Sequence, residues 1–116
     1  MSVPVHEVRI DRVGDVDVVR VTGEIDLSNA DAMVDAVTET ASRGVALELS
    51  ELAYLDSAGI RAIDQGFRTL QAEGRSLVVV VPEGSPAQWI FRVTGLADRL
   101  MARSLPEALA VLRDGG

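Results

Sequence analysis

The chain has 116 residues, 47% of them hydrophobic, which corresponds to a single domain over residues 1–116 with enough apolar side chains for a core. It contains no cysteine and one histidine, which excludes a disulfide framework, a thiolate metal site and a histidine-rich metal site. The net charge of −7 and the aromatic content of only 3% disfavour direct binding of DNA or RNA.

Hydrophobic runs are short throughout the chain. The longest purely aliphatic run, Leu77–Val81, is far too short to span a membrane. The first residues lack the basic and apolar regions of a secretory signal. We therefore expect a cytoplasmic protein that does not associate with a membrane.

The first part of the chain predicts a β-hairpin. Val5–Ile10 alternates apolar and polar residues, and Val16–Thr22 is rich in β-branched residues. Val13–Asp15 is turn-like, so we expect the two strands to pair antiparallel and the second strand to end at Gly23.

A first helix is predicted to begin at Ser28, with Asp31 three residues later in an arrangement like a capping box. Gly44 is a typical residue for its C-terminal end. Apolar residues between these limits follow helical spacing: Ala30, Met33, Val34, Val37 and Ala41.

The middle of the chain predicts two strands separated by a long helix. Val45–Leu49 is the first of these strands, and Ser76–Val81 has the continuous apolar pattern of a strand covered on both faces. Between them we expect a loop over Ser50–Leu55 and a helix that ends at Gly74. The apolar side of this helix steps by three or four residues: Ile60, Ile63, Phe67 and Leu70.

The last part of the chain predicts two further helices. Ser85–Pro86 is typical of a helix start, and that helix carries Trp89 and ends at Gly95. A short strand is expected near Leu100–Met101, followed by a helix that begins with the capping box Ser104–Glu107.

The resulting order is β-β-α-β-α-β-α-β-α. Strands that alternate with helices form a largely parallel sheet with right-handed crossovers. We therefore predict an α/β domain with a mixed, mostly parallel sheet and about four helices.

No motif of a nucleotide-binding loop, a hydrolase nucleophile or a zinc protease occurs in the chain. Paired carboxylates such as Glu24 and Asp26 are plentiful, but such pairs arise by chance in a chain this acidic. We therefore expect no catalytic residue, no cofactor and no metal site.

Asp56 and Ser57 lie between a predicted loop and a predicted helix at the carboxyl edge of the sheet, where open α/β folds place their sites. Two interpretations are open. In the structural one, Asp56 or Ser57 caps the helix and Gly59 permits close packing. In the functional one, Ser57 accepts a phosphate, which the free N–H groups and the positive end of the helix macrodipole stabilise.

Other side chains are expected to have structural roles. Trp89 is predicted to pack between a helix and the sheet, Tyr54 to be partly buried, and His6 to face solvent from its strand. Three arginines spaced by seven residues predict a solvated stripe on the long helix: Arg61, Arg68 and Arg75.

Three segments occur in order over essentially the whole chain: VTGEIDLSNA at Val21–Ala30, LELSELAYLDSAGI at Leu47–Ile60, and FRVTGL at Phe91–Leu96. Together they resemble the signature stretches of STAS domains, the family of anti-sigma factor antagonists and of related domains in sulfate transporters. The most specific part is the aspartate and serine followed by a small residue, a glycine and an aliphatic residue.

The resemblance implies a phosphorylation switch. In bacterial antagonists of this family, the serine after the aspartate, here Ser57, is phosphorylated by the cognate anti-sigma factor, an ATP-dependent serine kinase. The unphosphorylated antagonist binds the anti-sigma factor and frees the sigma factor, in settings such as stress response and sporulation. The phosphorylated antagonist is released, and a metal-dependent PP2C-type phosphatase resets it.

The resemblance also implies a docking face beside Ser57. Many family members have a second serine where this chain has Ala58, so no second hydroxyl directly follows Ser57 here. The residues expected to contact the partner, besides Ser57, are Glu24, Asp26, Ser28, Asn29, Asp56, Ala58 and Gly59.

Two alternatives remain open. One is a STAS scaffold, or a subunit of a membrane transport assembly, that is never phosphorylated and that copurifies with a transport ATPase rather than with a small kinase. A chain that starts at Met1 favours the free-standing antagonist, as a monomer or weak dimer, over a transporter's own domain. The other alternative is a small enzyme or ligand-binding protein that uses the loop at Asp56 and Ser57.

Overall fold

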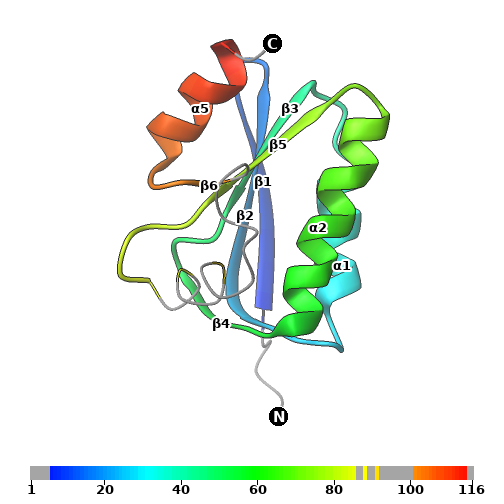
Figure 1. The fold of residues 1–116 in the computed structure, drawn as a ribbon, viewed down its shortest axis with the longest axis vertical. Helices are drawn as coiled ribbons and strands as arrows, with labels where there is room; N and C mark the ends of the chain where they lie inside the picture. Colours follow the sequence, from blue (N-terminus) through cyan, green and yellow to red (C-terminus); the bar gives the residue numbers. More distant parts are fainter. Residues whose placement is uncertain (1–5, 86–87, 89–90, 92–100, 115–116) are drawn as a thin grey trace.

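The fold is given by a computed structural model that describes residues 6–85, 88, 91 and 101–114 (Figure 1). Within these residues six strands form one mixed sheet, in the order β1-β2-β3-β5-β6, with β4 paired to β2. The strands are β1 (His6–Val13), β2 (Val16–Ile25), β3 (Gly44–Glu48), β4 (Leu52–Leu55), β5 (Ser76–Val80) and β6 (Met101–Ala102). β1 is antiparallel to β2, whereas every other pair is parallel. The predicted fold class, α/β with a mixed and mostly parallel sheet, is confirmed.

Three described helices cover the two faces of the sheet: α1 (Ala30–Thr38), α2 (Ser57–Ala72) and α5 (Leu105–Asp114). α1 and α2 lie on one face, and α5 lies on the other (Figure 1). The burial of consecutive residues 16–19 in β2 fits this arrangement, because side chains along a strand alternate between faces. Val19 belongs to the core under α1 and α2, whereas Val18 belongs to the core under α5. None of the described helices is both long and apolar enough to span a membrane.

The hairpin forms as predicted, but its second strand is longer than expected. Val13 pairs with Val16, and Gly14 between them has a positive φ of 61°, which suits a tight hairpin turn. Gly23 does not end β2. It has a φ of 89° at a register shift, and the strand continues to Ile25.

The extension of β2 exists because a strand that the sequence analysis missed pairs with it. Residues 50–55 were expected to be a loop, yet Leu52–Leu55 form β4, parallel to the last residues of β2. Leu52 and Leu55 are buried, whereas Tyr54 is 48% exposed rather than partly buried as predicted. The two buried leucines explain why this short segment is held against the sheet.

α1 begins later and ends earlier than predicted. Ser28 does not start it, because its N–H and hydroxyl both donate to Asp26 Oδ1, at 2.9 and 2.6 Å. The helix ends at Thr38 rather than near Gly44, which is the first residue of β3. Just past the end, the Thr40 hydroxyl donates to the Val37 carbonyl at 2.6 Å, so local hydrogen bonds replace a further helical turn.

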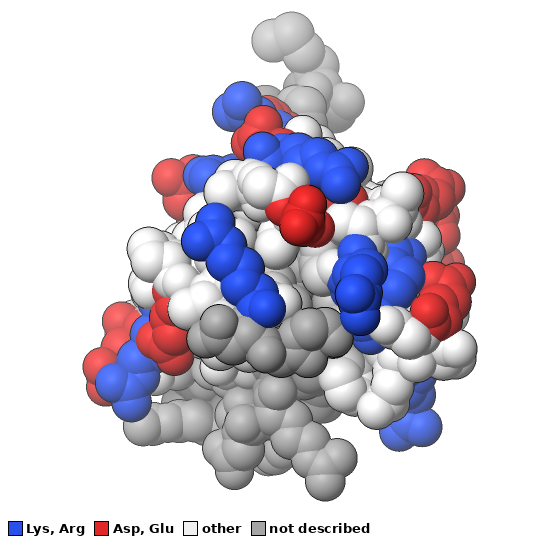
Figure 2. Space-filling view, turned by 90° about the horizontal axis from the view of Figure 1, so that it is seen from above, with Lys and Arg blue, Asp and Glu red and all other residues white. Residues whose placement is uncertain are grey.

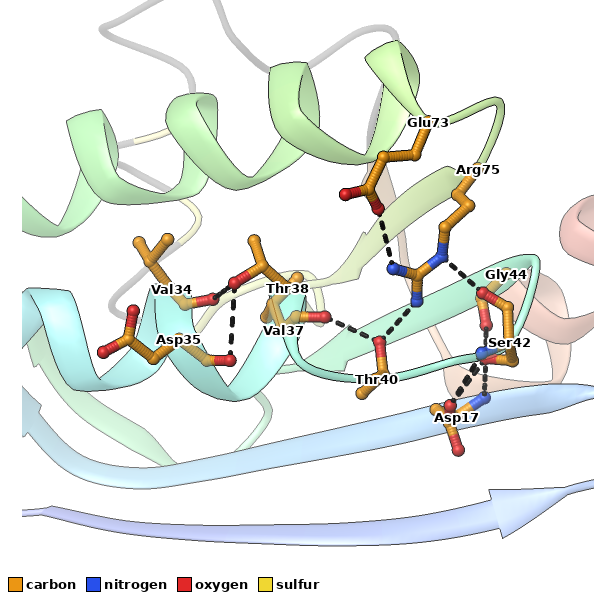
Figure 3. A network of polar contacts seen from close by, with 10 residues as sticks. All are labelled: Asp17, Val34, Asp35, Val37, Thr38, Thr40, Ser42, Gly44, Glu73 and Arg75. Atoms are coloured by element: carbon orange, nitrogen blue, oxygen red, sulfur yellow. Dashed lines mark hydrogen bonds and ion pairs between the residues drawn. The ribbon is translucent and has the colours of Figure 1, made fainter.

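A polar network ties the segment after α1 to β2 and to the segment after α2 (Figure 3). Arg75 donates through Nε to the Ser42 carbonyl at 2.6 Å and through a terminal nitrogen to Thr40 Oγ1 at 2.7 Å. Ser42 Oγ lies 2.7 Å from Asp17 Oδ2, and both of these residues are buried. Arg75 therefore does not extend a solvated stripe with Arg61: it lies beyond the end of α2, and its side chain is only 12% exposed.

Replacing Arg75 by alanine is expected to lower the free energy of unfolding by about 1–3 kcal/mol, because partly buried acceptors lose a charged donor. The matched control is Arg68→Ala, which removes an exposed ion pair with Asp64 within α2 and is expected to cost less than about 0.5 kcal/mol. Urea denaturation of both variants measures the difference. Equal losses of unfolding free energy in the two variants would show that the hydrogen bonds of Arg75 add no particular stability.

The end of the chain forms the short strand and the last helix that were predicted. β6 lies where a short strand was expected, and Ser104 Oγ accepts a hydrogen bond from the Glu107 N–H at 3.3 Å at the start of α5. Of the predicted helix that carries Trp89, the structure describes Gln88 and Phe91, and both are helical. Trp89 itself and the orientation of the His6 side chain lie outside the described residues.

Candidate functional site

Ser57 lies at the carboxyl edge of the sheet, because α2 begins beside β4 at the lower end of the view in Figure 1. It is the first residue of α2 and directly follows β4, separated from it only by Asp56. Leu55 pairs with Ile25, so the chain leaves β4 and β2 at neighbouring points. The Asp56 N–H also donates to the Ile25 carbonyl at 3.2 Å, which joins the start of α2 to the end of β2.

Asp56 caps α2, as the structural interpretation predicts. Its Oδ1 accepts hydrogen bonds from the Ala58 N–H at 2.9 Å and the Gly59 N–H at 3.2 Å. The Ile60 N–H donates to the Asp56 carbonyl at 3.1 Å. These N–H groups are therefore already bonded, which corrects the expectation that the helix start offers them to a phosphate. The cap leaves the Ser57 side chain exposed.

Gly59 permits close packing at this point, as predicted. A Cβ built on Gly59 would overlap Leu55 Cδ1 and would lie 3.1 Å from Ile25 Cγ2. Leu55 and Ile25 are both buried in the core. The first turn of α2 is thus pressed directly onto the ends of β2 and β4.

Hydrogen bonds also hold the loop between β2 and α1. Asn29 is buried, and its side chain accepts from the Asp26 N–H and donates to the Glu24 carbonyl, both at 2.9 Å. The Asp26 carboxylate in turn accepts from the Ser28 N–H and hydroxyl. This loop is therefore a second fixed element beside Ser57.

The residues predicted to contact a partner differ in accessibility. Glu24, Ser28 and Ser57 are exposed, and Asp26 and Asp56 are half-buried. The other three are buried and shape the edge from below: Asn29, Ala58 and Gly59. That these residues bind a partner stays a prediction.

Two exposed apolar side chains lie near this edge, Leu27, which the sequence analysis did not single out, and Tyr54, which it expected to be partly buried. Leu27 is 79% exposed in the loop between Asp26 and Ser28, and Tyr54 projects from β4, where it pairs with Glu24. The exposure of Leu27 could have been predicted from the sequence, because this leucine lies between polar loop residues. For Tyr54 no signal existed, because its exposure depends on the unexpected strand.

A groove of about 280 Å³ runs between the beginnings of α1 and α2. Leu27 and Asp31 line one side, while Ala58, Arg61 and Gln65 line the other. Arg61 lies one helical turn after Ser57, so the groove adjoins the side of α2 that carries Ser57. A partner that reaches Ser57 can therefore also contact Leu27 and Arg61.

Charge distinguishes the two ends of the domain. Carboxylates dominate around Ser57, where Glu24, Asp26 and Asp56 lie at the ends of β2 and β4. Figure 2 shows the opposite end, where arginines gather beside acidic residues. Arg43 and Arg113 line a groove of about 300 Å³ there. A basic partner is therefore attracted to the Ser57 end rather than to the arginine-lined end.

The site has no evident metal centre. Within the described part of the chain, no three His, Asp or Glu side chains are grouped so that they could hold a metal ion. The exposed hydroxyl and the neighbouring carboxylates lie on an open surface.

Comparisons with known proteins agree with this architecture. Residues 7–108 match the family model described as STAS domain. A search of curated proteins found no match.

Solved structures give further matches. An anti-sigma factor antagonist from Mycobacterium paratuberculosis has a TM-score of 0.84 at 24% identity, over 98% of this chain and 100% of that one. The unphosphorylated antagonist SpoIIAA has a TM-score of 0.72 at 19% identity, over 95% and 98% of the two chains. The phosphorylated form of the Bacillus cell fate determinant SpoIIAA has a TM-score of 0.64 at 21% identity, over 90% and 97%. At these identities the likeness shows a shared fold.

Proposed function

Since the chain belongs to the STAS domain family, we propose that it is a non-enzymatic anti-sigma factor antagonist controlled by phosphorylation of Ser57. The unmodified protein binds an anti-sigma factor serine kinase in the cytoplasm and thereby frees a sigma factor. The phosphorylated protein dissociates, and a PP2C-type phosphatase restores it. The observation that carries the proposal is the exposed Ser57 hydroxyl on a rigid acidic edge, directly after the capping Asp56.

The proposed reaction needs only the hydroxyl from this chain. The Ser57 oxygen forms a bond to the γ-phosphorus of ATP as the bond to the bridging β–γ oxygen breaks. ADP leaves with that bridging oxygen, and the hydroxyl proton passes to a base on the kinase. Nucleotide and magnesium belong to the partner, in line with the lack of nucleotide-binding motifs in this chain.

The rigidity of the edge supports a switch that acts by charge rather than by refolding. Asp56 fixes the start of α2, and Asn29 fixes the loop after β2. A phosphate on Ser57 adds about −1.5 to −2 charge at pH 7 to this surface. The added charge and bulk then separate two surfaces that fit when Ser57 carries a neutral hydroxyl.

Association with the kinase is expected to depend on the acidic residues of this edge. Glu24→Gln and Asp26→Asn should each slow association roughly two- to fivefold at low ionic strength, because they weaken the field that steers a basic partner. The control is Glu39→Gln, which removes an exposed charge at the far end of α1. Surface-based binding kinetics at two salt concentrations measure the rates. Unchanged association rates for both edge variants would place the docking surface elsewhere.

A reconstituted release assay tests the proposed function. Each small serine kinase of the anti-sigma factor class from the source genome is bound to its sigma factor, and the unmodified protein is then added. We expect one kinase to exchange its sigma factor for this protein, and ATP to reverse the exchange as Ser57 becomes phosphorylated. No release from any kinase, together with copurification of the protein with a transport ATPase, would favour the scaffold alternative.

A further inference from the structure

The surroundings of Ser57 are unfavourable for the phosphate that the proposed function places there. A phosphoserine carries about −1.5 to −2 charge at pH 7, and carboxylates already stand at Asp56, Asp26 and Glu24. The N–H groups of Ala58 and Gly59, which could otherwise stabilise it, donate to the Asp56 side chain. A cation close to Ser57 would therefore stabilise the phosphate.

Arg61 is placed to supply that cation. It lies four residues after Ser57 on α2, and side chains at this spacing are neighbours, with their Cβ atoms about 5–6 Å apart. Helical side chains also lean toward the N-terminus of their helix, so Arg61 leans toward Ser57.

The guanidinium of Arg61 is exposed and is not committed to another carboxylate. Arg68 pairs with Asp64 at 2.9 Å, and Arg75 pairs with Glu73 at 3.1 Å. Among the described residues, Arg61 takes part in no ion pair, although Asp31 lines the same groove from α1. Arg61 can thus bind a phosphate without giving up an ion pair.

We propose that Arg61 is a positioning residue that binds the phosphate of phosphorylated Ser57 within the same molecule. This inference rests on the proposed phosphorylation of Ser57. A guanidinium can donate two parallel hydrogen bonds to a phosphate, which suits arginine better than lysine for this role.

Binding of the phosphate also changes the groove beside Ser57. In the unmodified protein, Arg61 lines that groove together with Leu27 and Asp31. Once Arg61 turns to the phosphate, the groove loses its cation at the same time as the edge gains negative charge. Phosphorylation then alters two parts of the docking surface rather than one.

The ionisation of the phosphate provides the test, because a nearby cation favours the dianion and so lowers the pKa of its second proton, which is about 6 in free phosphoserine. The full chain is produced with phosphoserine installed at position 57 during translation, so no kinase is required. Its pKa is measured by phosphorus NMR between pH 4 and pH 8. The neighbouring groups Asp56, Asp26, Glu24 and Asp31 are shared by all the variants compared.

Arg61→Gln is expected to raise the phosphoserine pKa by at least about 0.3 unit, the size expected for an ion pair between residues four apart on a helix. Arg68→Gln is the matched control, because it removes an exposed arginine of the same helix that lies about 16 Å from Ser57 along the axis. We expect the control to change the pKa by less than about 0.1 unit. The Nε–H signal of Arg61 should also differ in position between the unmodified protein and the protein that carries phosphoserine at position 57.

No change in Arg61→Gln, or equal changes in both variants, would overturn the proposal. This outcome is distinguishable from failure of the proposed function. If Arg61→Gln leaves the phosphoserine pKa unchanged while the kinase assay succeeds, only the proposed role of Arg61 is lost. If the pKa shift is present while no kinase exchanges its sigma factor, the phosphate-binding arrangement stands and the antagonist role is lost.

Discussion

Replacing Ser57 by alanine is expected to abolish incorporation of phosphate from ATP by the partner kinase. Ser57 carries the exposed hydroxyl at the start of α2, and the next residue, Ala58, has none. The variant should still bind the kinase, because the binding-competent form carries an uncharged residue at this position. It should therefore release the sigma factor even in the presence of ATP. Intact-mass measurement after incubation with kinase and ATP gives the extent of modification.

The control for this experiment is Ser28→Ala, which removes another exposed serine hydroxyl at the edge of the sheet that carries Ser57. It should be phosphorylated as fully as the unsubstituted protein. Both variants should unfold within about 1 kcal/mol of the unsubstituted protein, as is usual for surface substitutions. Phosphate retained in Ser57→Ala and mapped to Ser28 or Thr22 would contradict the assignment.

Replacing Gly59 by valine is expected to destabilise the domain by about 1–3 kcal/mol or more, because the added atoms overfill a close-packed region. A Cβ at this position already overlaps Leu55 Cδ1 and crowds Ile25 Cγ2. Leu55 and Ile25 have little room to move, since both are buried at the ends of β4 and β2. Chemical denaturation gives the free energy, and the same distortion should weaken kinase binding because α2 carries Ser57.

Gly66→Ala is the matched control on the same helix. The nearest atom to a Cβ at Gly66 is Val37 Cγ1 at 3.7 Å, an ordinary contact. We expect this variant to be more stable than the unsubstituted protein by about 0.5–1 kcal/mol, because alanine is favoured over glycine within a helix. Equal destabilisation by both substitutions would show that the packing at Gly59 is not special.

Strands with continuous apolar runs could be predicted from the sequence because their own residues specify burial on both faces. β3 and β5 are of this kind. β4 could not be predicted in this way, because only two of its four residues are buried and it forms by pairing with the extended end of β2. Arg75 escaped prediction for a similar reason, since its partners Thr40 and Ser42 lie more than thirty residues earlier in the chain.

The position of the candidate site was predictable, whereas its hydrogen bonding was not. Asp56 and Ser57 stand at the start of a helix with a clear apolar pattern, which suffices to place them at the carboxyl edge of the sheet. Either residue could serve as the cap on sequence alone. Only the geometry shows that the Asp56 carboxylate accepts hydrogen bonds from the N–H groups of Ala58 and Gly59.

The central claim is that phosphate on Ser57 releases the partner, and the most direct measurement is the affinity of the kinase for two forms of the protein. One form carries the unmodified Ser57, and the other carries phosphoserine at position 57 installed during translation. Isothermal titration calorimetry with the kinase in the presence of ADP should show the phosphorylated form binding at least about tenfold more weakly, a difference of about 1.4 kcal/mol. Equal or tighter binding of the phosphorylated form would contradict the account.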